Sequence, residues 1–324
     1  MRGVDYIVKR TGTALLTVFV AITLNFILFR AVPGSAVSAL RCFHCTKEFK
    51  AAVEEELGLD KSLGQQYVIY LGSLARGNLG TSFVDHRSVW QNLKTPILNT
   101  LPMLLAGTVI SVAIGITAGV VAAWRRGTTS DRVSTWSALA FYAMPTQWLG
   151  LLVVFYIALR FGLPVAGIRD PTLGILGEPS TLTVVADRIR HMALPALTLG
   201  IGLYGEYALI VRSSMLETLG EDYVLTARAK GLKNWDIVWR HGLRNAMLPL
   251  VTLIALSFGY ILAGAIVIEE VFSYPGIGLA TINAIDQRDY PVLQGAFLLL
   301  TLSVIFFNFV ADLLYFKLDP RVTA

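Results

Sequence analysis

Six apolar runs decide what this chain can fold into, because each is long enough to cross a lipid bilayer. A membrane-spanning helix needs about 20 mostly apolar residues, and the runs lie near 11–30, 100–123, 136–160, 192–211, 247–268 and 291–316. Of the 324 residues, 55% are hydrophobic and only 15% are charged, and the mean hydropathy is +0.62. This composition is not that of an ordinary soluble domain. The sequence therefore predicts an all-α polytopic membrane protein with six transmembrane helices.

The basic residues predict the orientation of these helices. Six spans place both chain ends on one side of the membrane, and Lys and Arg crowd both ends and the short connections after the second and fourth runs. Because such loops stay inside, we expect a multi-pass membrane protein with both termini in the cytoplasm. The first run is too long for a signal-peptide core of ~7–15 residues, so we expect it to remain as a helix. The spread of the basic residues over several loops argues against nucleic-acid binding.

The connections between the runs differ greatly in length, and this predicts the division of the chain. Residues 1–31 form the N-terminal cytoplasmic end and the first helix, and residues 32–95 form a large extracytoplasmic segment with helical periodicity. Residues 96–317 form the membrane core, and 318–324 form a cytoplasmic tail. A second outer loop, about 161–190, is rich in Pro and Gly, which predicts an irregular lid or re-entrant piece.

Two cysteines, Cys42 and Cys45, stand in a C-F-H-C pattern in the large outer segment. A pair at this spacing can be a disulfide, a dithiol or half of a zinc site. No second pair of ligands accompanies it, so we predict no metal site. The outer compartment favours a small local disulfide, and unpaired thiols without a role are the alternative.

Catalytic patterns are absent from the sequence. The four histidines are dispersed, and there is no H-E-x-x-H or G-x-S-x-G motif. The chain contains no Gly-Lys pair, so it has no phosphate-binding loop of the G-x-x-x-x-G-K-[ST] kind. We therefore expect that the chain is not an enzyme and holds no cofactor of its own. If ATP drives its activity, another chain must bind the nucleotide.

A charged helical stretch, Asp222 to Arg244, separates the fourth and fifth apolar runs. It forms most of a cytoplasmic loop, residues 214–245, which we call the basic loop. Ala227 and Gly231 are small enough to allow a partner to approach closely, and Arg228 and Lys230 offer charge to acidic groups. We interpret the loop as a docking surface through which a cytoplasmic partner pushes on the membrane helices. The alternative is a solvated face that touches nothing.

Two features near the membrane are candidates for the pore or its gate. Glu206 lies within an apolar run, where a charge is costly and therefore a functional candidate. The alternative is that it pairs with a basic residue such as Arg212. The turn Tyr274-Pro275-Gly276 follows the fifth run, with Glu269 and Glu270 expected at the outer mouth. It is either a gate or a plain surface turn.

The basic loop resembles the coupling loop of the permeases of ABC importers. Thr226-Ala227 is followed by Gly231-Leu232, Val238 and Leu243-Arg244 at the spacing of that signature, while Leu225 departs from the usual acidic residue or Arg. FRAVPGSA, RHMALPALTLG, RSSMLE, EEVFSYPGIGLATINAIDQRDYPVLQG and ADLLYFKLDPRV resemble further blocks of the dipeptide and oligopeptide permeases. The resemblance covers essentially the whole chain and is to the first permease of the pair, the one with the larger outer segment.

This resemblance implies a type I ABC-importer core in the inner (plasma) membrane of a prokaryote, which forms the path for di- or oligopeptides. Its partners would be a second homologous permease, two ATPase subunits that bind ATP and Mg²⁺, and an external substrate-binding protein. The ATPase contact would fall on Thr226, Ala227, Arg228, Lys230, Gly231 and Leu232. Permeases of this subfamily also serve nickel, glutathione, haem and oligosaccharides. A proton-driven secondary transporter is the rival class, but it would be expected to show ionisable residues on several spans.

Overall fold

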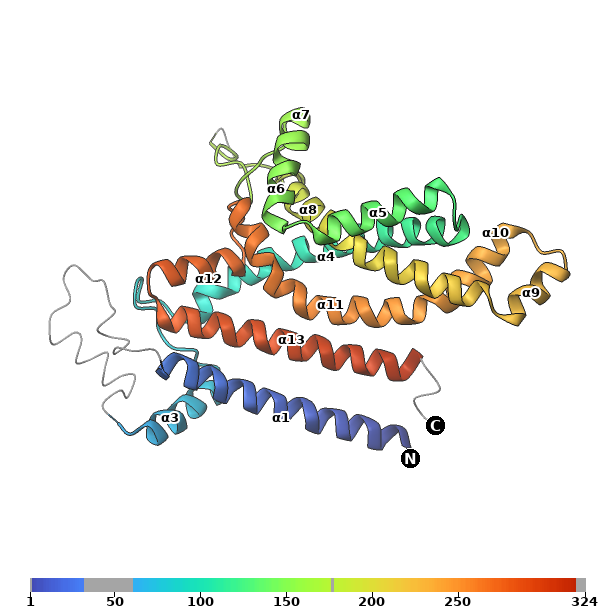
Figure 1. The fold of residues 1–324 in the computed structure, drawn as a ribbon. Coiled ribbons are helices and arrows are strands. Elements are labelled where there is room, and N and C mark those ends of the chain that lie inside the picture. Colours follow the sequence, from blue (N-terminus) through green and yellow to red (C-terminus); the bar gives the residue numbers. More distant parts are fainter. Residues whose placement is uncertain (1, 32–60, 176–177, 319–324) are drawn as a thin grey trace.

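The computed structural model describes residues 2–31, 61–175 and 178–318 of the chain. Helices dominate these ranges and no strand occurs in them, which confirms the predicted all-α class. Figure 1 shows the helices in chain order: α1 (Arg2–Ala31), α3 (Leu63–Ala75), α4 (Val89–Trp124), α5 (Thr129–Ala143), α6 (Thr146–Val153), the π-helical segment η1 (Val154–Ala158), α7 (Leu159–Phe161), α8 (Thr181–Leu219), α9 (Asp222–Ala229), α10 (Asn234–Asp236), the π-helical segment η2 (Ile237–Leu243), α11 (Arg244–Val271), α12 (Ile277–Asp286) and α13 (Tyr290–Leu318).

Four described helices are long and apolar enough to cross a membrane by themselves. They cover Asp5–Arg30, Val89–Trp124, Thr181–Leu219 and Tyr290–Leu313. The pair Thr129–Ala143 and Thr146–Phe161 supplies a fifth span if the two are taken together. The 28 residues of α11 contain the run near 247–268, but some of its side chains lie outside the described set. The count of six therefore stays a prediction.

The third apolar run, near 136–160, is not one straight helix. Its two halves, α5 and the continuous segment Thr146–Phe161 that contains α6, η1 and α7, meet at an angle of 109°. The break falls at Met144, whose ψ of 130° is extended, and at Pro145, which precedes α6. A proline has no backbone N–H and disfavours a helical conformation in the residue before it, so α5 must end here. As a result, the chain turns sharply after α5, so that α7 projects from the bundle (Figure 1) while α6 still packs on α8 and α11.

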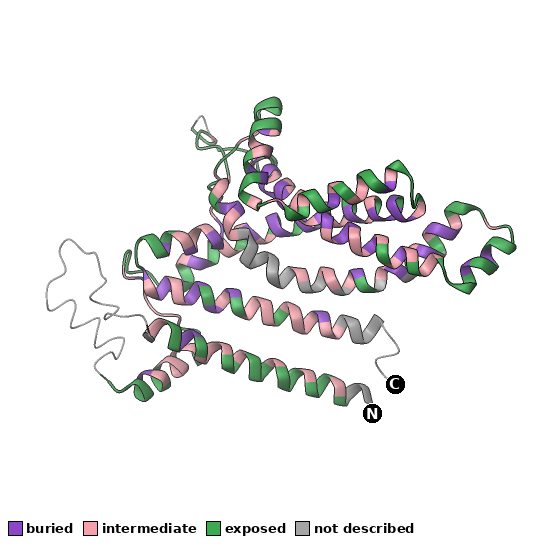
Figure 2. Ribbon diagram, viewed as in Figure 1, coloured by how far each residue is buried: buried purple, intermediate pink, exposed green. Residues whose placement is uncertain are grey.

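The centre of the bundle is the pair α4 and α8, which make the most extensive contact between two described helices. Every fourth residue of α4 along this contact is small: Gly107, Ser111, Gly115 and Gly119. A Cβ added at Gly115 would lie 2.5 Å from Cβ of Tyr207 in α8, and one added at Gly119 would lie 2.6 Å from the Ala208 carbonyl oxygen. Small residues at this spacing let two membrane helices approach closely, where dispersion contacts hold them together. Buried residues accordingly follow α4 and α8 through the middle of the bundle (Figure 2).

The helix α1 lies at the edge of the bundle beside α13 (Figure 1). Only 11% of its apolar stretch is buried, so most of its surface is left to lipid or to another chain. Near its C-terminal end, Asn25 donates to the Gln294 carbonyl at 3.4 Å and accepts from the Tyr70 hydroxyl of α3 at 3.1 Å. Near its start, Arg10 pairs with Asp312 at 3.2 Å.

Two of the predicted segment boundaries fall inside helices of the structure. The predicted irregular loop at about 161–190 is shorter than expected, because α8 already begins at Thr181. Ser180 caps that helix by accepting a hydrogen bond from the Thr183 amide at 3.2 Å. On the other side, α4 begins at Val89 and passes through the proposed boundary between residues 95 and 96. The cysteines Cys42 and Cys45 lie outside the described residues.

Candidate functional site

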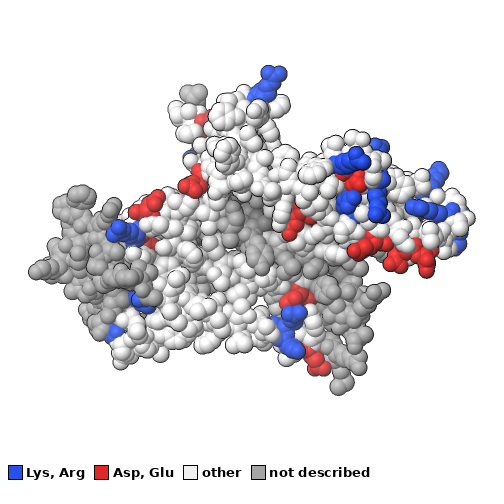
Figure 3. All heavy atoms as spheres, in the orientation of Figure 1, with Lys and Arg blue, Asp and Glu red and all other residues white. Residues whose placement is uncertain are grey.

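The basic loop lies at the far end of the bundle from α3, where α8 ends and α11 begins (Figure 1). The start of α1 and the end of α13 point toward the same end of the molecule. Lys and Arg gather on the tip of the bundle that α9 and α10 form with the turn between α4 and α5, as Figure 3 shows. That this end of the molecule lies in the cytoplasm stays a prediction.

Gly231 shapes the turn that ends α9. Its φ of 75° is in the left-handed region, which glycine adopts without a steric penalty. The Gly231 amide donates to the Arg228 carbonyl at 2.9 Å, and the Leu232 amide donates to the Ala227 carbonyl at 3.3 Å. These two hydrogen bonds form a Schellman motif, which satisfies carbonyls at the helix end. Apart from its chain neighbours, no atom of the described residues lies within 4 Å of a Cβ added at Gly231, so within this chain the need for glycine comes from the backbone and not from crowding.

A small apolar core keeps the basic loop folded. It consists of Val224 and Ile237, each 0% exposed, and Ala227 at 6%, with Leu219 and Leu232 packed against them. Ala227 therefore faces its own chain, whereas the sequence interpretation used its small size to admit a partner. The Schellman turn and this core join α9, α10 and η2 into one compact unit at the end of α8.

The outer surface of the basic loop combines apolar and basic side chains. Leu225 is 54% exposed and Trp235 is 70% exposed, and the ring of Trp235 lies 5.1 Å from that of Trp239. Thr226, Arg228 and Lys230 are exposed beside them. Large exposed apolar side chains ringed by charge are typical of a protein-binding surface. Spacing indicates which residues face outward, because Val224 and Ala227 occupy the buried side of α9.

The turn proposed as a gate is packed tightly against α4. Tyr274 is 3% exposed, and its hydroxyl donates to the Asn99 carbonyl at 3.1 Å. The Asn99 side chain in turn donates to the Pro275 carbonyl at 2.8 Å. A Cβ at Gly276 would overlap the side chains of Glu269 and Thr100. Tyr274, Pro275 and Gly276 thus form a fixed joint between α11 and α12 in this conformation.

Glu269 lies at the centre of that joint. We had expected it to be available at the outer mouth instead. It is 0% exposed, whereas its neighbour Glu270 is exposed. Its carboxylate accepts hydrogen bonds from the amides of Gly278 at 2.7 Å and Leu279 at 3.0 Å, and from the Thr100 hydroxyl at 2.5 Å. The two amides belong to the first turn of α12, where a carboxylate is favoured by the helix dipole. The expectation failed because sequence alone does not show which side of α11 faces this turn.

Glu206 lies half-buried in α8, between the buried residues Gly205 and Tyr207. Within the described residues its carboxylate has no ion pair. Arg212, named as a partner in the alternative interpretation, binds Asp131 of α5 instead, at 2.7 Å and 3.0 Å, so the structure does not contain a Glu206–Arg212 pair. Glu206 and Tyr274 form no common site either. Tyr274 packs in the cluster that contains Leu194, twelve residues or about 18 Å along α8 from Glu206.

Comparison with known proteins assigns a family to this architecture. Residues 115–324 match the family described as binding-protein-dependent transport system inner membrane component, and residues 3–106 match the N-terminal part of such membrane components. The chain belongs to this family of ABC-importer permeases. The permease is 40% identical over 332 residues to the di/tripeptide transport system permease protein DppB of Pseudomonas aeruginosa, with 98% of each chain covered. It is 38% identical to the dipeptide transport system permease protein DppB of Escherichia coli K12, and 34% identical to the glutathione transport system permease protein GsiC of Escherichia coli O6:H1, again with 98% of each chain covered.

The sequence interpretation of the permease missed several residues that the structure brings together. Asn99 and Thr100 hold the joint after α11, and Asp131 binds Arg212. Asn99 lies 176 positions from its partner Pro275, and Asp131 lies 81 positions from Arg212. Contacts over such separations leave no local pattern. The exposure of Trp235 had a visible signal, since a large aromatic residue between Asn234 and Asp236 has no apolar neighbour on either side.

Proposed function

We propose that this permease is the transmembrane subunit of an ATP-driven importer and that its cargo is di- or oligopeptides. The observation that carries the proposal is similarity over 98% of the chain, at 40% and 38% identity, to permeases described as di/tripeptide and dipeptide transporters. Similarity of this extent includes the basic loop, the joint after α11 and the outer segment, rather than a single motif.

The proposed partners follow from what the chain itself does not supply. Its sequence has no phosphate-binding loop, so two ATPase subunits would bind ATP and Mg²⁺. A second homologous permease would complete the path, and an external binding protein would deliver the peptide. Orientation with both termini in the cytoplasm would present the basic loop to the ATPases.

The basic loop is proposed as the element that receives force. Its exposed side chains, Leu225 and Trp235 among them, would sit in a groove of the ATPase, with Arg228 and Lys230 paired to acidic groups there. Because the loop is held by its own apolar core and by the Schellman turn at Gly231, a push on it would be transmitted to α8 and α11 rather than absorbed. Selectivity would reside mainly in the binding protein, since a path for many peptides must bind each weakly.

Purification followed by reconstitution tests this proposal. The chain should co-purify from native membranes in mild detergent with a second permease and ATPase subunits. In vesicles, the complex should take up a labelled dipeptide only when ATP and the binding protein are supplied. Uptake driven by a proton gradient without ATP would instead identify a secondary transporter.

Glutathione is the second candidate cargo, because the permease is also 34% identical over 98% of its length to a glutathione permease. Competition decides between the two. An excess of unlabelled dipeptides should suppress uptake of the labelled dipeptide more strongly than glutathione does. Uptake of glutathione with no uptake of dipeptides would refute the peptide assignment while leaving the importer assignment intact.

A further inference from the structure

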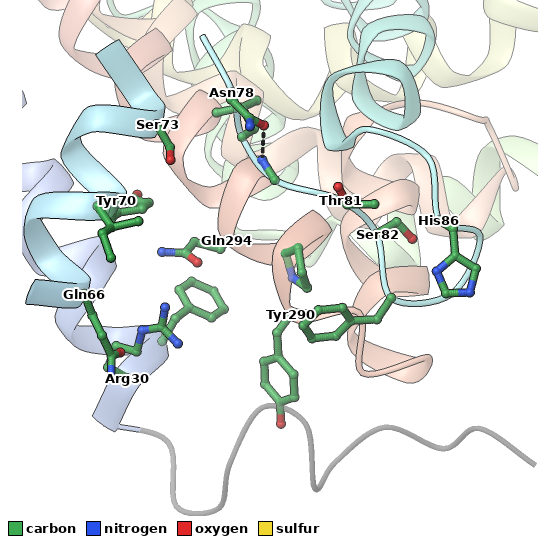
Figure 4. Close-up of a pocket in the computed structure, with 16 residues that line it drawn as sticks. Arg30, Gln66, Tyr70, Ser73, Asn78, Thr81, Ser82, His86, Tyr290 and Gln294 are labelled. Atoms are coloured by element: carbon green, nitrogen blue, oxygen red, sulfur yellow. Dashed lines mark hydrogen bonds between the residues drawn. The ribbon is translucent and has the colours of Figure 1, made fainter. Parts of the chain in front are cut away.

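The described part of the permease contains a polar cavity that the transport mechanism does not use. It has a volume of about 230 Å³ and lies between the C-terminal end of α1, the helix α3, the segment 78–86 and the start of α13. Figure 4 shows the Arg30 guanidinium from α1 and the Gln294 side-chain amide from α13 approaching the same open space. The cavity is at the edge of the bundle, where α1 packs on α13.

The charge of this cavity is unbalanced. Among the described residues that line it, Arg30 is the only Lys or Arg and none is acidic. Within those residues Arg30 forms no ion pair, and its guanidinium instead lies over the Phe26 ring, 5.6 Å from the ring centre. Burial raises the pKa of Tyr70, which also lines the cavity, to about 12, so this phenol stays neutral. A half-buried cation among neutral polar groups attracts an anion.

The position of Arg30 indicates where that anion comes from. Arg30 is the last residue of the apolar stretch Asp5–Arg30, which places its side chain at the level of the lipid headgroups. Phe29 lines the cavity and packs edge-on against Phe297, with 5.9 Å between the ring centres. Phe297 is 39% exposed and follows Tyr290 and Gln294 on one side of α13. An apolar surface therefore leads away from the polar cavity, as it would for the acyl chains of a lipid.

We propose that this cavity binds the headgroup of an anionic phospholipid, with its phosphate on Arg30. The volume of about 230 Å³ is below the ~300–1,000 Å³ usual for sites that take drug-sized ligands, which suits a headgroup. Phosphatidylglycerol fits better than phosphatidylethanolamine. Its hydroxyls find hydrogen-bond partners such as Ser73 and Gln294, whereas the ammonium group of ethanolamine finds no carboxylate among the described lining residues.

Native mass spectrometry of the full-length permease, together with any partner chains that co-purify, tests the assignment. Phosphatidylglycerol and phosphatidylethanolamine with identical acyl chains are titrated separately, and the bound lipids are counted. The permease should retain phosphatidylglycerol at a roughly tenfold lower concentration than phosphatidylethanolamine. Arg30→Gln should bring the two lipids to near equality, and Arg30→Lys should keep the preference because it keeps the charge. Arg160→Gln, at an exposed arginine of α7, should behave like the wild type.

Three results would overturn the proposal. Equal retention of both lipids by the wild type would remove the predicted selectivity, and an unchanged preference in Arg30→Gln would remove Arg30 from the site. Displacement of the lipid by soluble glycerol 3-phosphate at the same concentration would assign the cavity to a free phosphate compound. Arg30→Lys and Arg160→Gln must both keep the preference, so that its loss in Arg30→Gln is assigned to the charge at residue 30.

Discussion

Asp131 and Arg212 join α5 to α8 by two parallel hydrogen bonds, from Nε to Oδ1 at 2.7 Å and from Nη2 to Oδ2 at 3.0 Å. Asp131 also accepts from the Gly127 amide at 3.0 Å, so one carboxylate fixes both the turn before α5 and its contact with α8. The pair is a salt bridge that ties the start of α5 to α8, the helix that leads into the basic loop.

Asp131→Asn should therefore destabilise the permease. The amide cannot accept both guanidinium hydrogen bonds, and we expect a loss of roughly 2–3 kcal/mol, less than for a fully buried pair because Arg212 is 27% exposed. The midpoint of thermal unfolding in detergent measures the effect. Glu217→Gln, at an exposed carboxylate of α8, is the control and should stay within about 0.5 kcal/mol of the wild type. Equal thermal midpoints for both variants would show that the Asp131–Arg212 salt bridge does not contribute to stability.

Glu269→Gln should weaken the joint between α11 and α12. The carboxylate accepts hydrogen bonds from two backbone amides and one hydroxyl. The glutamine side chain would place its NH₂ group, which cannot accept, against at least one of these donors. A buried donor left without an acceptor costs about 1–3 kcal/mol, which a shift of the thermal midpoint reports. Glu270→Gln is the matched control one residue away, since Glu270 is exposed and should tolerate the change.

Substitution of Gly231 should act through the backbone conformation and not through side-chain size. At a φ of 75°, an alanine costs about 1–2 kcal/mol, while an asparagine costs less. Peptide uptake by reconstituted complexes should therefore fall in Gly231→Ala and recover in Gly231→Asn, although asparagine is the larger. Gly12→Ala in α1, where space is also open, should have no effect. A loss that grows with side-chain volume would point to a close contact with a partner instead.

The exposed apolar residues of the basic loop should govern assembly with the ATPase. Trp235→Ala and Leu225→Asp are expected to reduce co-purification of the ATPase subunits, because interface aromatic residues commonly account for 2 kcal/mol or more. Quantification of the subunits on a gel after affinity purification measures this. Leu182→Ala, at a leucine of α8 that is 78% exposed near the other end of the helix, serves as the control. Full recovery of the ATPase with both loop variants would place the contact elsewhere.

Glu206→Gln separates a transport role from a structural one. Within the described residues the carboxylate has no ion pair, so its neutralisation should leave the thermal midpoint unchanged or slightly higher. Uptake should nevertheless fall by roughly tenfold if the charge lines the path. Normal uptake in a fully assembled complex would end the assignment of Glu206 to the pore.

The helical class and the position of most apolar runs could be predicted from sequence, because length and hydropathy are local properties. The corner at Pro145 was also visible in principle, since proline acts on the residue beside it. The burial of Glu269 and the pairing of Arg212 with Asp131 could not be predicted in this way, because they depend on which faces of distant helices meet. Ala227 shows the same limit within a single motif. The sequence shows that its side chain is small, but not that this side chain packs against its own chain.

The small residues of α4 also determine where this permease is able to change shape. With Gly115 against Tyr207 and Gly119 against Val211, neither α4 nor α8 has room to rotate or slide along the other by the width of a methyl group. The two helices must travel together as one solid body. Any switch between outward and inward access must then be taken up outside this pair, and the 109° bend between Thr129–Ala143 and Thr146–Phe161 is one such place in the described chain. The close packing of α4 on α8 thus limits which parts of the permease are able to move.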